Sequence, residues 1–332
     1  MMKKIFLVLV MLFSLFACSN ESKDISEVTI AMIRVPNDET LAKAEGIFEK
    51  NFDELGIKVN YVYFDSGVQA NQALASDAVD FATMGNTNSI VSLATDLDVK
   101  LVWIHEVLGT AEALVVKDDI NSVEDLKGKV IATPFASTSH YILLNVLKEA
   151  GIENDVTLLN MKTAEIVAAW ERGDIDAAYT WQPTLGQIAT SGKILVTSED
   201  MIKKGYITAN VTVARSYICE NNPEIVETYI NSVDEAGDLY RNNPEQAIAS
   251  VASELEISES DAKKFMSSSI WIDKNDLLSE NYFGSNEKPG NFVNVMNDTA
   301  QFLSEQGSIT NVPTFDQFND FIDPTFIESV KD

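Results

Sequence analysis

Hydrophobic residues in the first third of the chain switch between two spacings. Short runs of apolar and β-branched residues are typical of buried strands, and apolar residues three or four positions apart are typical of helices. These patterns follow one another, strand first, at residues 28–35, 38–56, 59–64, 68–76, 78–85, 86–96 and 99–107. Alternation with short loops predicts β-α-β units, so we expect an α/β fold with mainly parallel sheets flanked by helices.

A second unit of the same kind begins near residue 113. Its strand patterns cover residues 113–117, 129–133, 156–160, 175–181 and 193–198. An alternating strand pattern at 207–218 follows, and the later segments have helical spacing. The stretches 73–85 and 169–181 share a helix end, an acidic turn and a strand, which indicates two similar lobes. We predict that lobe 1 comprises residues 28–114 and 213–332 and that lobe 2 comprises residues 115–212.

Small polar residues gather at three turns where a predicted strand leads into a predicted helix: Asp65-Ser66, Asn86-Thr87-Asn88 and Ser137-Thr138-Ser139. For any one turn alone, helix capping is the alternative, because a cap needs only one such residue. In open parallel sheets, ligands bind beyond the carboxyl ends of the strands, where helix N-termini favour anions. A cleft between two lobes would bring the three turns face to face, so we expect an anion site there.

Composition limits the partners and the chemistry. The 332 residues include 24 Lys and Arg against 51 Asp and Glu, a net charge of −27, which excludes a general nucleic-acid surface and a polybasic membrane patch. A bound anion would therefore be held by local dipoles. Two histidines and two cysteines exclude a His-rich metal centre and a disulfide framework, and no dinucleotide, P-loop or calcium signature occurs. We expect no cofactor and no metal.

The first residues carry the pattern of a bacterial lipoprotein signal. Two lysines precede an apolar run, residues 5–17, that is too short to span a bilayer comfortably and that ends directly before Cys18. We expect residues 1–17 to be removed, Cys18 to be acylated and residues 18–27 to form a polar tether. The protein would then be extracytoplasmic and anchored to a bacterial membrane without spanning it. The alternative is an ordinary signal peptide in which Cys18 is incidental.

Several stretches of the chain resemble one known family. They are "FDSGVQANQALASDAVDFATMGN", "EALVVK", "LKGKVIATPFASTSHYILLNVLKEAGI", "AEIVAAWERGDIDAAYTWQPTL" and "DTAQFLSEQG". Together they resemble the taurine-binding branch of the taurine, aliphatic sulfonate and nitrate ABC-transporter binding proteins. The resemblance implies a two-lobed type II periplasmic-binding (Venus-flytrap) fold. It also implies a monomer that closes on a small organic anion, delivers it to permease subunits, and is not an enzyme.

The resemblance also implies which residues contact the ligand. They are Asn37 in the loop "RVPND", Asn86, Thr87, Glu112, Ser137, Thr138, Ser139, His140, Trp181 and Asn210. Other roles are open for four of these. Trp181 could pack in the core, His140 could cap or fill the helix entry, Asn210 could be an ordinary strand residue, and Glu112 could pair at a hinge.

Two departures from the family pattern concern the ligand. The first-lobe turn reads Gly-Asn-Thr-Asn at residues 85–88, where the taurine proteins usually have Gly-Ser-Ser-Pro. Asn210 stands where the taurine branch typically has an aspartate, a natural partner for an amine. Taurine or a related alkanesulfonate is the expected ligand, and nitrate or a thiamine-precursor-like heterocycle is the alternative. A desulfinase-like enzyme is the rival class, but it needs an activated nucleophile, and Cys219 has no histidine nearby in the sequence.

The lipoprotein interpretation makes a direct prediction for Cys18→Ala. Because the thiol is the site of acylation, the variant should leave the membrane fraction or keep its signal peptide. Fractionation and intact mass measure both outcomes. Unchanged mass and unchanged fractionation would rule out acylation.

Overall fold

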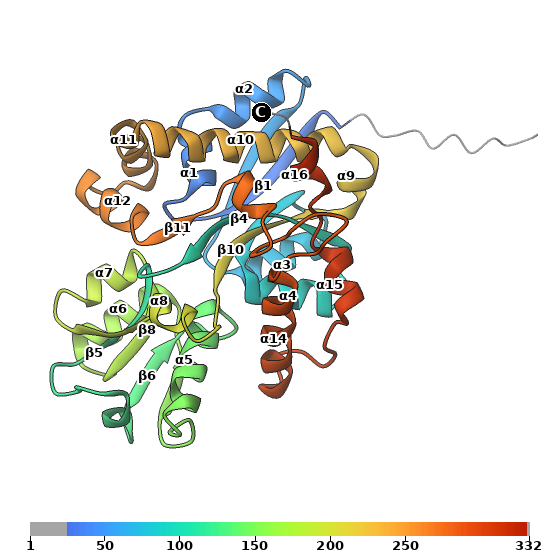
Figure 1. The fold of residues 1–332 in the computed structure, drawn as a ribbon. Coiled ribbons are helices and arrows are strands. Elements are labelled where there is room, and N and C mark those ends of the chain that lie inside the picture. Colours follow the sequence, from blue (N-terminus) through green and yellow to red (C-terminus); the bar gives the residue numbers. More distant parts are fainter. Residues whose placement is uncertain (1–24, 331–332) are drawn as a thin grey trace, which may run out of the picture.

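The computed structural model describes residues 25–330, which form two sheets with helices packed against them (Figure 1). The predicted signal peptide, Cys18 and the start of the predicted tether lie outside the described residues. The first sheet has the order β11-β4-β10-β3-β1-β2. Its strands are β1 (Glu27–Ile33), β2 (Lys58–Phe64), β3 (Phe81–Gly85), β4 (Val99–Leu108), β10 (Ala209–Arg215) and β11 (Ser269–Trp271). β1 pairs in parallel with β2 and β3, whereas β10 is antiparallel to β3 and β4.

The second sheet repeats this arrangement with the order β7-β6-β8-β5-β9. Its strands are β5 (Glu112–Val116), β6 (Val130–Thr133), β7 (Thr157–Asn160), β8 (Ala177–Trp181) and β9 (Lys193–Thr197). β6 pairs in parallel with β7 and β8, whereas β5 is antiparallel to β8 and β9. The predicted α/β class is confirmed. Both sheets are mixed, because β5 of the second sheet follows directly after β4 of the first, and β10 of the first sheet follows β9 of the second.

Helices cover both sheets. Around the first sheet lie α1 (Asp38–Ala44), α2 (Ile47–Asp53), α3 (Gly67–Ala75), α4 (Asn86–Ala94), α9 (Ser216–Asn221), α10 (Pro223–Asn242), α11 (Pro244–Leu255), α12 (Glu259–Met266), α13 (Lys274–Leu277), α14 (Phe292–Glu305), α15 (Phe315–Phe321) and α16 (Thr325–Ser329). Around the second lie η1 (Val123–Leu126), α5 (Thr138–Glu149), α6 (Thr163–Arg172), α7 (Thr184–Ile188) and α8 (Ser198–Ile202).

Two predicted elements differ from the structure for local reasons. The helix predicted over residues 38–56 is two helices, α1 and α2, because Gly46 between them adopts a left-handed conformation with φ 68°. The strand predicted over 207–218 ends at Arg215, where β10 pairs with the first residue of β4, Val99. Beyond that point no strand partner is left, and the chain turns into α9, which contains the buried Cys219.

Aromatic packing holds the long helix α10 on the first sheet. The Tyr229 ring stacks on Phe81 with centroids 4.6 Å apart and on Phe48 at 5.4 Å. The second sheet is covered on one face by α5 and on the other by α6 and α7. Phe302 of α14 belongs to the α5 cluster, where its ring meets Tyr141 edge-on at 5.1 Å. The C-terminal region therefore contacts the second sheet's layer as well as the first.

A buried ion pair lies inside the first sheet's layer. Asp38, in the first turn of α1, is 2.5 Å from His105 Nδ1 of β4 and also accepts a 2.9 Å hydrogen bond from Trp103 Nε1. Burial alone would lower the pKa of His105, but the charge and hydrogen bond of Asp38 outweigh it and raise that pKa to about 9. His105 is thus a cation at neutral pH and is paired with Asp38 in the core.

Asp38→Asn should remove this pairing while keeping the side-chain shape. The pKa of His105 rises from 6.5 to about 9 on folding, so its stabilising contribution is complete below pH 6.5 and disappears as pH rises through 9. We expect the variant to lose about 3 kcal/mol of unfolding free energy near pH 6. It should also lack much of the wild-type decline between pH 6.5 and 9.

Urea unfolding at pH 6 and pH 9.5 measures both effects. Asp320→Asn is the control, because Asp320 pairs with Lys100 at the surface with 81% of its side chain exposed, and such pairs contribute little. An equal loss in both variants, or an unchanged pH dependence in Asp38→Asn, would contradict the assignment.

Candidate functional site

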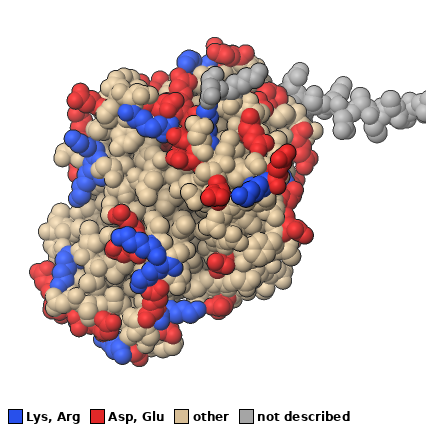
Figure 2. All heavy atoms as spheres, viewed as in Figure 1, with Lys and Arg blue, Asp and Glu red and all other residues tan. Residues whose placement is uncertain are grey.

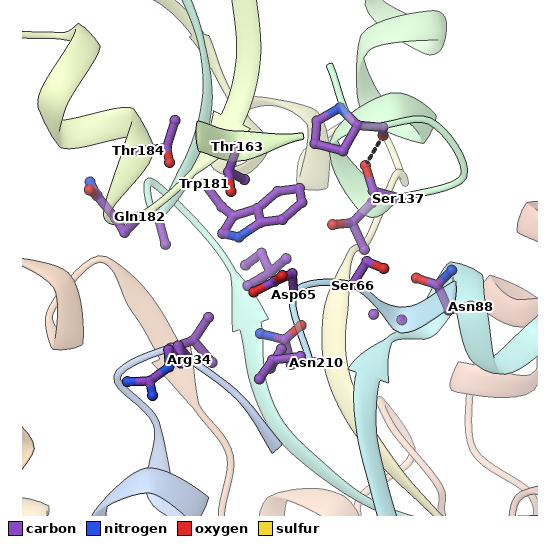
Figure 3. Close-up of a pocket in the computed structure, with 18 of the residues that line it drawn as sticks. Arg34, Asp65, Ser66, Asn88, Ser137, Thr163, Trp181, Gln182, Thr184 and Asn210 are labelled. Atoms are coloured by element: carbon purple, nitrogen blue, oxygen red, sulfur yellow. Dashed lines mark hydrogen bonds between the residues drawn. The ribbon is translucent and has the colours of Figure 1, made fainter. Parts of the chain in front are cut away.

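A cavity of about 280 Å³ lies between the two sheets' layers and is lined by residues of both. One wall comes from the loops after β1, β2 and β3 and from β4 and β10. The opposite wall comes from the loop before α5 and from the end of β8. Figure 3 shows polar side chains of both walls pointing into the same space.

Three helix N-termini meet at this cavity. Ser66 precedes α3, Gly85 precedes α4 and Ser137 precedes α5, and all three line it. The first N–H groups of a helix have no intrahelical acceptor, and the helix dipole makes this end positive. The structure thus brings together the three polar turns singled out in the sequence. Ser137 is also a cap, since its Oγ accepts a 3.2 Å hydrogen bond from His140 N.

Close contact at these turns requires glycine. A Cβ on Gly67 would lie 2.4 Å from Asn88 Oδ1, and one on Gly85 would lie 2.8 Å from Thr138 Cγ2. Asn88 in turn donates a 2.9 Å hydrogen bond from Nδ2 to Ala136 O, which joins α4 to the loop before α5. The two walls of the cavity therefore touch at the starts of α4 and α5.

Aromatic rings form the less polar part of the cavity. Trp181, at the end of β8, and Phe135 both line it. His140 stacks behind Phe135 with ring centroids 4.4 Å apart, and burial lowers the pKa of His140 to about 4. His140 is therefore neutral at physiological pH, and it supports Phe135 without lining the cavity itself.

Glu112 lies outside the lining. Its Oε1 accepts hydrogen bonds from the hydroxyls of Thr138 (2.6 Å) and Ser139 (2.7 Å). Its Oε2 accepts from Ser198 (2.7 Å) and Thr208 (3.1 Å). Burial raises the pKa of this carboxyl, and the four hydroxyls act against that shift. Glu112 joins β5, α5, α8 and the segment that enters β10.

Three further predicted residues lie beneath the cavity rather than on its surface. Asn37 caps α1 by accepting a 3.0 Å hydrogen bond from Thr40 N. Asn86 Oδ1 accepts from Ala209 N at 3.2 Å. Thr87 is buried, and its hydroxyl has no partner among the described residues. Of the predicted set, Ser137, Thr138, Trp181 and Asn210 line the cavity.

Three charged residues line the cavity, and two of them, unlike Asp65 in its polar turn, were not singled out from the sequence. Arg34 follows β1, and it is the one Lys or Arg in the cavity lining; its guanidinium lies 4.6 Å from the centre of the Tyr63 ring. Glu106 lies in β4, where its Oε1 accepts a 2.6 Å hydrogen bond from Asn210 Nδ2. Burial raises the pKa of Glu106 to about 7 against the opposing charge of His105. An acid next to a histidine in an otherwise apolar strand was the available signal.

Comparison with known proteins identifies the family of this chain. The NMT1/THI5 like family model matches residues 41–247. The chain belongs to this family. It is also 32% identical over 308 residues to the taurine-binding periplasmic protein of Escherichia coli K12. This alignment covers 91% of this chain and 92% of the Escherichia coli protein. The resemblance predicted from the sequence is confirmed.

Solved structures share the fold. The periplasmic aliphatic sulphonate binding protein SsuA from Escherichia coli superposes with a TM-score of 0.72 at 21% identity, over 88% of this chain and 91% of that one. The desulfurization enzyme DSZB superposes with a TM-score of 0.64 at 18% identity, over 92% and 98%. The predicted two-lobed periplasmic-binding fold is confirmed, and the same fold occurs in a binding protein and in an enzyme.

Between residues 25 and 330, none of the helices has the length and hydropathy needed to cross a bilayer. In the same range, no cluster of three or more His, Cys, Asp or Glu side chains is arranged to hold a metal ion.

Glu112→Ala should destabilise the fold, because four buried hydroxyls lose their acceptor at once. Losing hydrogen bonds to a buried charged group costs about 3 kcal/mol or more of unfolding free energy. Glu112→Gln keeps the shape and one acceptor oxygen, so its loss should be smaller.

Denaturant unfolding compares these variants with Glu171→Ala, an exposed acid of α6 whose removal should change stability by less than about 0.5 kcal/mol. If Glu112→Ala were as stable as Glu171→Ala, the hydrogen bonds of Glu112 would not hold β5, α5, α8 and the segment before β10 together.

Proposed function

We propose that this protein is an extracytoplasmic solute-binding protein of an ABC importer, which captures a small organic sulfonate and delivers it to the membrane permease. The observation that carries the proposal is the meeting of three helix N-termini, α3, α4 and α5, at one cavity between the two sheets' layers. Such ends bind anions through free N–H groups and the helix dipole.

The charge of the protein makes this local arrangement decisive. The net charge is −27, and on the face seen in Figure 2 Lys and Arg lie in small groups among Asp and Glu without a broad basic patch. An anion therefore gains little from the overall field. Arg34 and the three N-termini supply the favourable local potential, and the cavity volume of about 280 Å³ suits a small molecule.

The relatives support a sulfonate over nitrate. One is named a taurine-binding protein and another an aliphatic sulphonate binding protein. Trp181 and Phe135 offer apolar surface to a short carbon chain, which nitrate lacks.

Binding is favoured over catalysis by the state of Cys219. This thiol is buried in α9 and is not part of the cavity lining, and burial raises its pKa to about 12. A thiol with so high a pKa is not an activated nucleophile.

The wider organisation belongs to the same proposal. Residues 1–17 are a signal peptide, Cys18 carries the lipid, and residues 18–27 tether a monomer to the membrane. Residues 28–114 with 213–332 form one lobe and residues 115–212 the other, and closure of the lobes by hinge motion holds the ligand.

A thermal-shift and calorimetric panel tests the function. Short alkanesulfonates should raise the melting temperature, whereas nitrate and aminopyrimidines should not, because ligand that binds only the folded state stabilises it by mass action. Arg34→Met should weaken sulfonate binding about 10- to 150-fold, as expected for the loss of a hydrogen bond to a charged group.

Lys58→Met is the matched control, because Lys58 is exposed at the far end of β2 from the cavity. A shift with nitrate or aminopyrimidine alone would refute the sulfonate assignment, and turnover of a sulfinate by the purified protein would support an enzyme.

A further inference from the structure

Glu106 is an unusual member of the cavity lining. Only 3% of it is exposed, and it lies on β4 among apolar residues. One carboxylate oxygen, Oε1, accepts a hydrogen bond from Asn210 Nδ2 at 2.6 Å. The other, Oε2, is buried and has no hydrogen-bond partner among the described residues. A buried acceptor left unpaired is costly, so such an atom on a residue that lines the cavity points to a donor that the ligand supplies.

The surrounding charges do not neutralise Glu106. His105, which directly precedes Glu106, is the nearest cation in the sequence, and it is already paired with Asp38. The Asn37 side chain lies near Glu106 and lowers its pKa, although Asn37 Nδ2 and Glu106 Oε2 do not reach hydrogen-bond geometry. Arg34 and Asp65, the other charged residues of the lining, are exposed and so remain hydrated. Burial raises the pKa of Glu106 to about 7, and the charge of Asp38 adds to this shift while the charge of His105 opposes it.

Asn210 explains the orientation of the carboxylate. Asn210 and Glu106 are paired residues of the antiparallel strands β10 and β4, and both line the cavity. An amide cannot be the counterion of an ammonium group, but this one donates to Oε1 and leaves Oε2 for the ligand. The resemblance expects an acid at position 210, and the structure has an acid, Glu106, at the paired position of the neighbouring strand.

From this geometry we propose that the ligand carries a protonated amine as well as a sulfonate, and that Glu106 is the residue that selects for the amine. The inference rests on the proposed function, since the sulfonate end is assigned to the helix N-termini. Figure 3 shows Asn210 below Trp181, with Ser66, Asn88 and Ser137 from the starts of α3, α4 and α5 to its right. A short zwitterion would thus span from the N-termini to the β4–β10 pair.

Two ligands of equal size test the proposal. 2-Aminoethanesulfonate and propane-1-sulfonate differ by an ammonium group in place of a methyl group. Calorimetric titration of the wild-type protein at pH 8 should show the amino compound binding about 10- to 150-fold more tightly, the range expected for a hydrogen bond between charged groups. Glu106→Gln should remove this preference by weakening the amino compound alone, and Glu199→Gln, an exposed acid of α8, should keep it.

A pH series gives a second readout that does not depend on a variant. Affinity for 2-aminoethanesulfonate should rise between pH 6 and pH 8 as Glu106 loses its proton, and affinity for propane-1-sulfonate should not. If neither sulfonate binds the wild-type protein, the proposed function itself fails.

If propane-1-sulfonate binds as tightly as the amino compound, or if Asp65→Asn and not Glu106→Gln removes the preference, the sulfonate function stands and the role of Glu106 is wrong. Equal weakening of both ligands by Glu106→Gln would also overturn it.

Discussion

The two chain segments that cross between the sheets are joined by the carboxylate of Glu112. Glu112 begins β5, which leaves the first sheet's layer, and its Oε2 accepts from Thr208, just before β10 returns to it. The same carboxylate accepts from Thr138 and Ser139 at the start of α5. The position of α5 relative to the first sheet, and so the shape of the cavity, depends on this joint.

Buried acids in this protein are stabilised in different ways. Asp38 has a cationic partner in His105, and Glu112 has four hydroxyl donors. Glu39 accepts from Thr83 and Tyr229 within the core. Glu106 has a single amide donor and faces the cavity. Glu39 Oε2 and Glu106 Oε2 both lack a hydrogen-bond partner among the described residues, and of these two acids Glu106 is the one that lines the cavity.

The architecture was largely predictable from the sequence because hydrophobic spacing and turn composition are local signals. The alternation of strands and helices and the three polar turns before α3, α4 and α5 follow from such signals, and the structure brings the turns to one cavity. The break of the first helix at Gly46 was less visible, since a single glycine is tolerated within many helices.

The contacts of individual polar residues were not predictable in the same way. Whether Glu112 faces a ligand or four hydroxyls depends on residues up to 96 positions away, such as Thr208. The pairing of Asn210 with Glu106 depends on the register of β10 against β4, which includes a bulge next to Asn210. Sequence patterns specify which face of a strand is buried, but they do not specify which cross-strand partner a polar side chain meets.

A crystal structure of the protein grown with 2-aminoethanesulfonate tests the account most directly. The account predicts the sulfonate oxygens within hydrogen-bond distance of the first N–H groups of α3, α4 or α5, and the ammonium within hydrogen-bond distance of Glu106 Oε2. Ligand density outside this cavity, or a sulfonate turned toward Glu106, would contradict it.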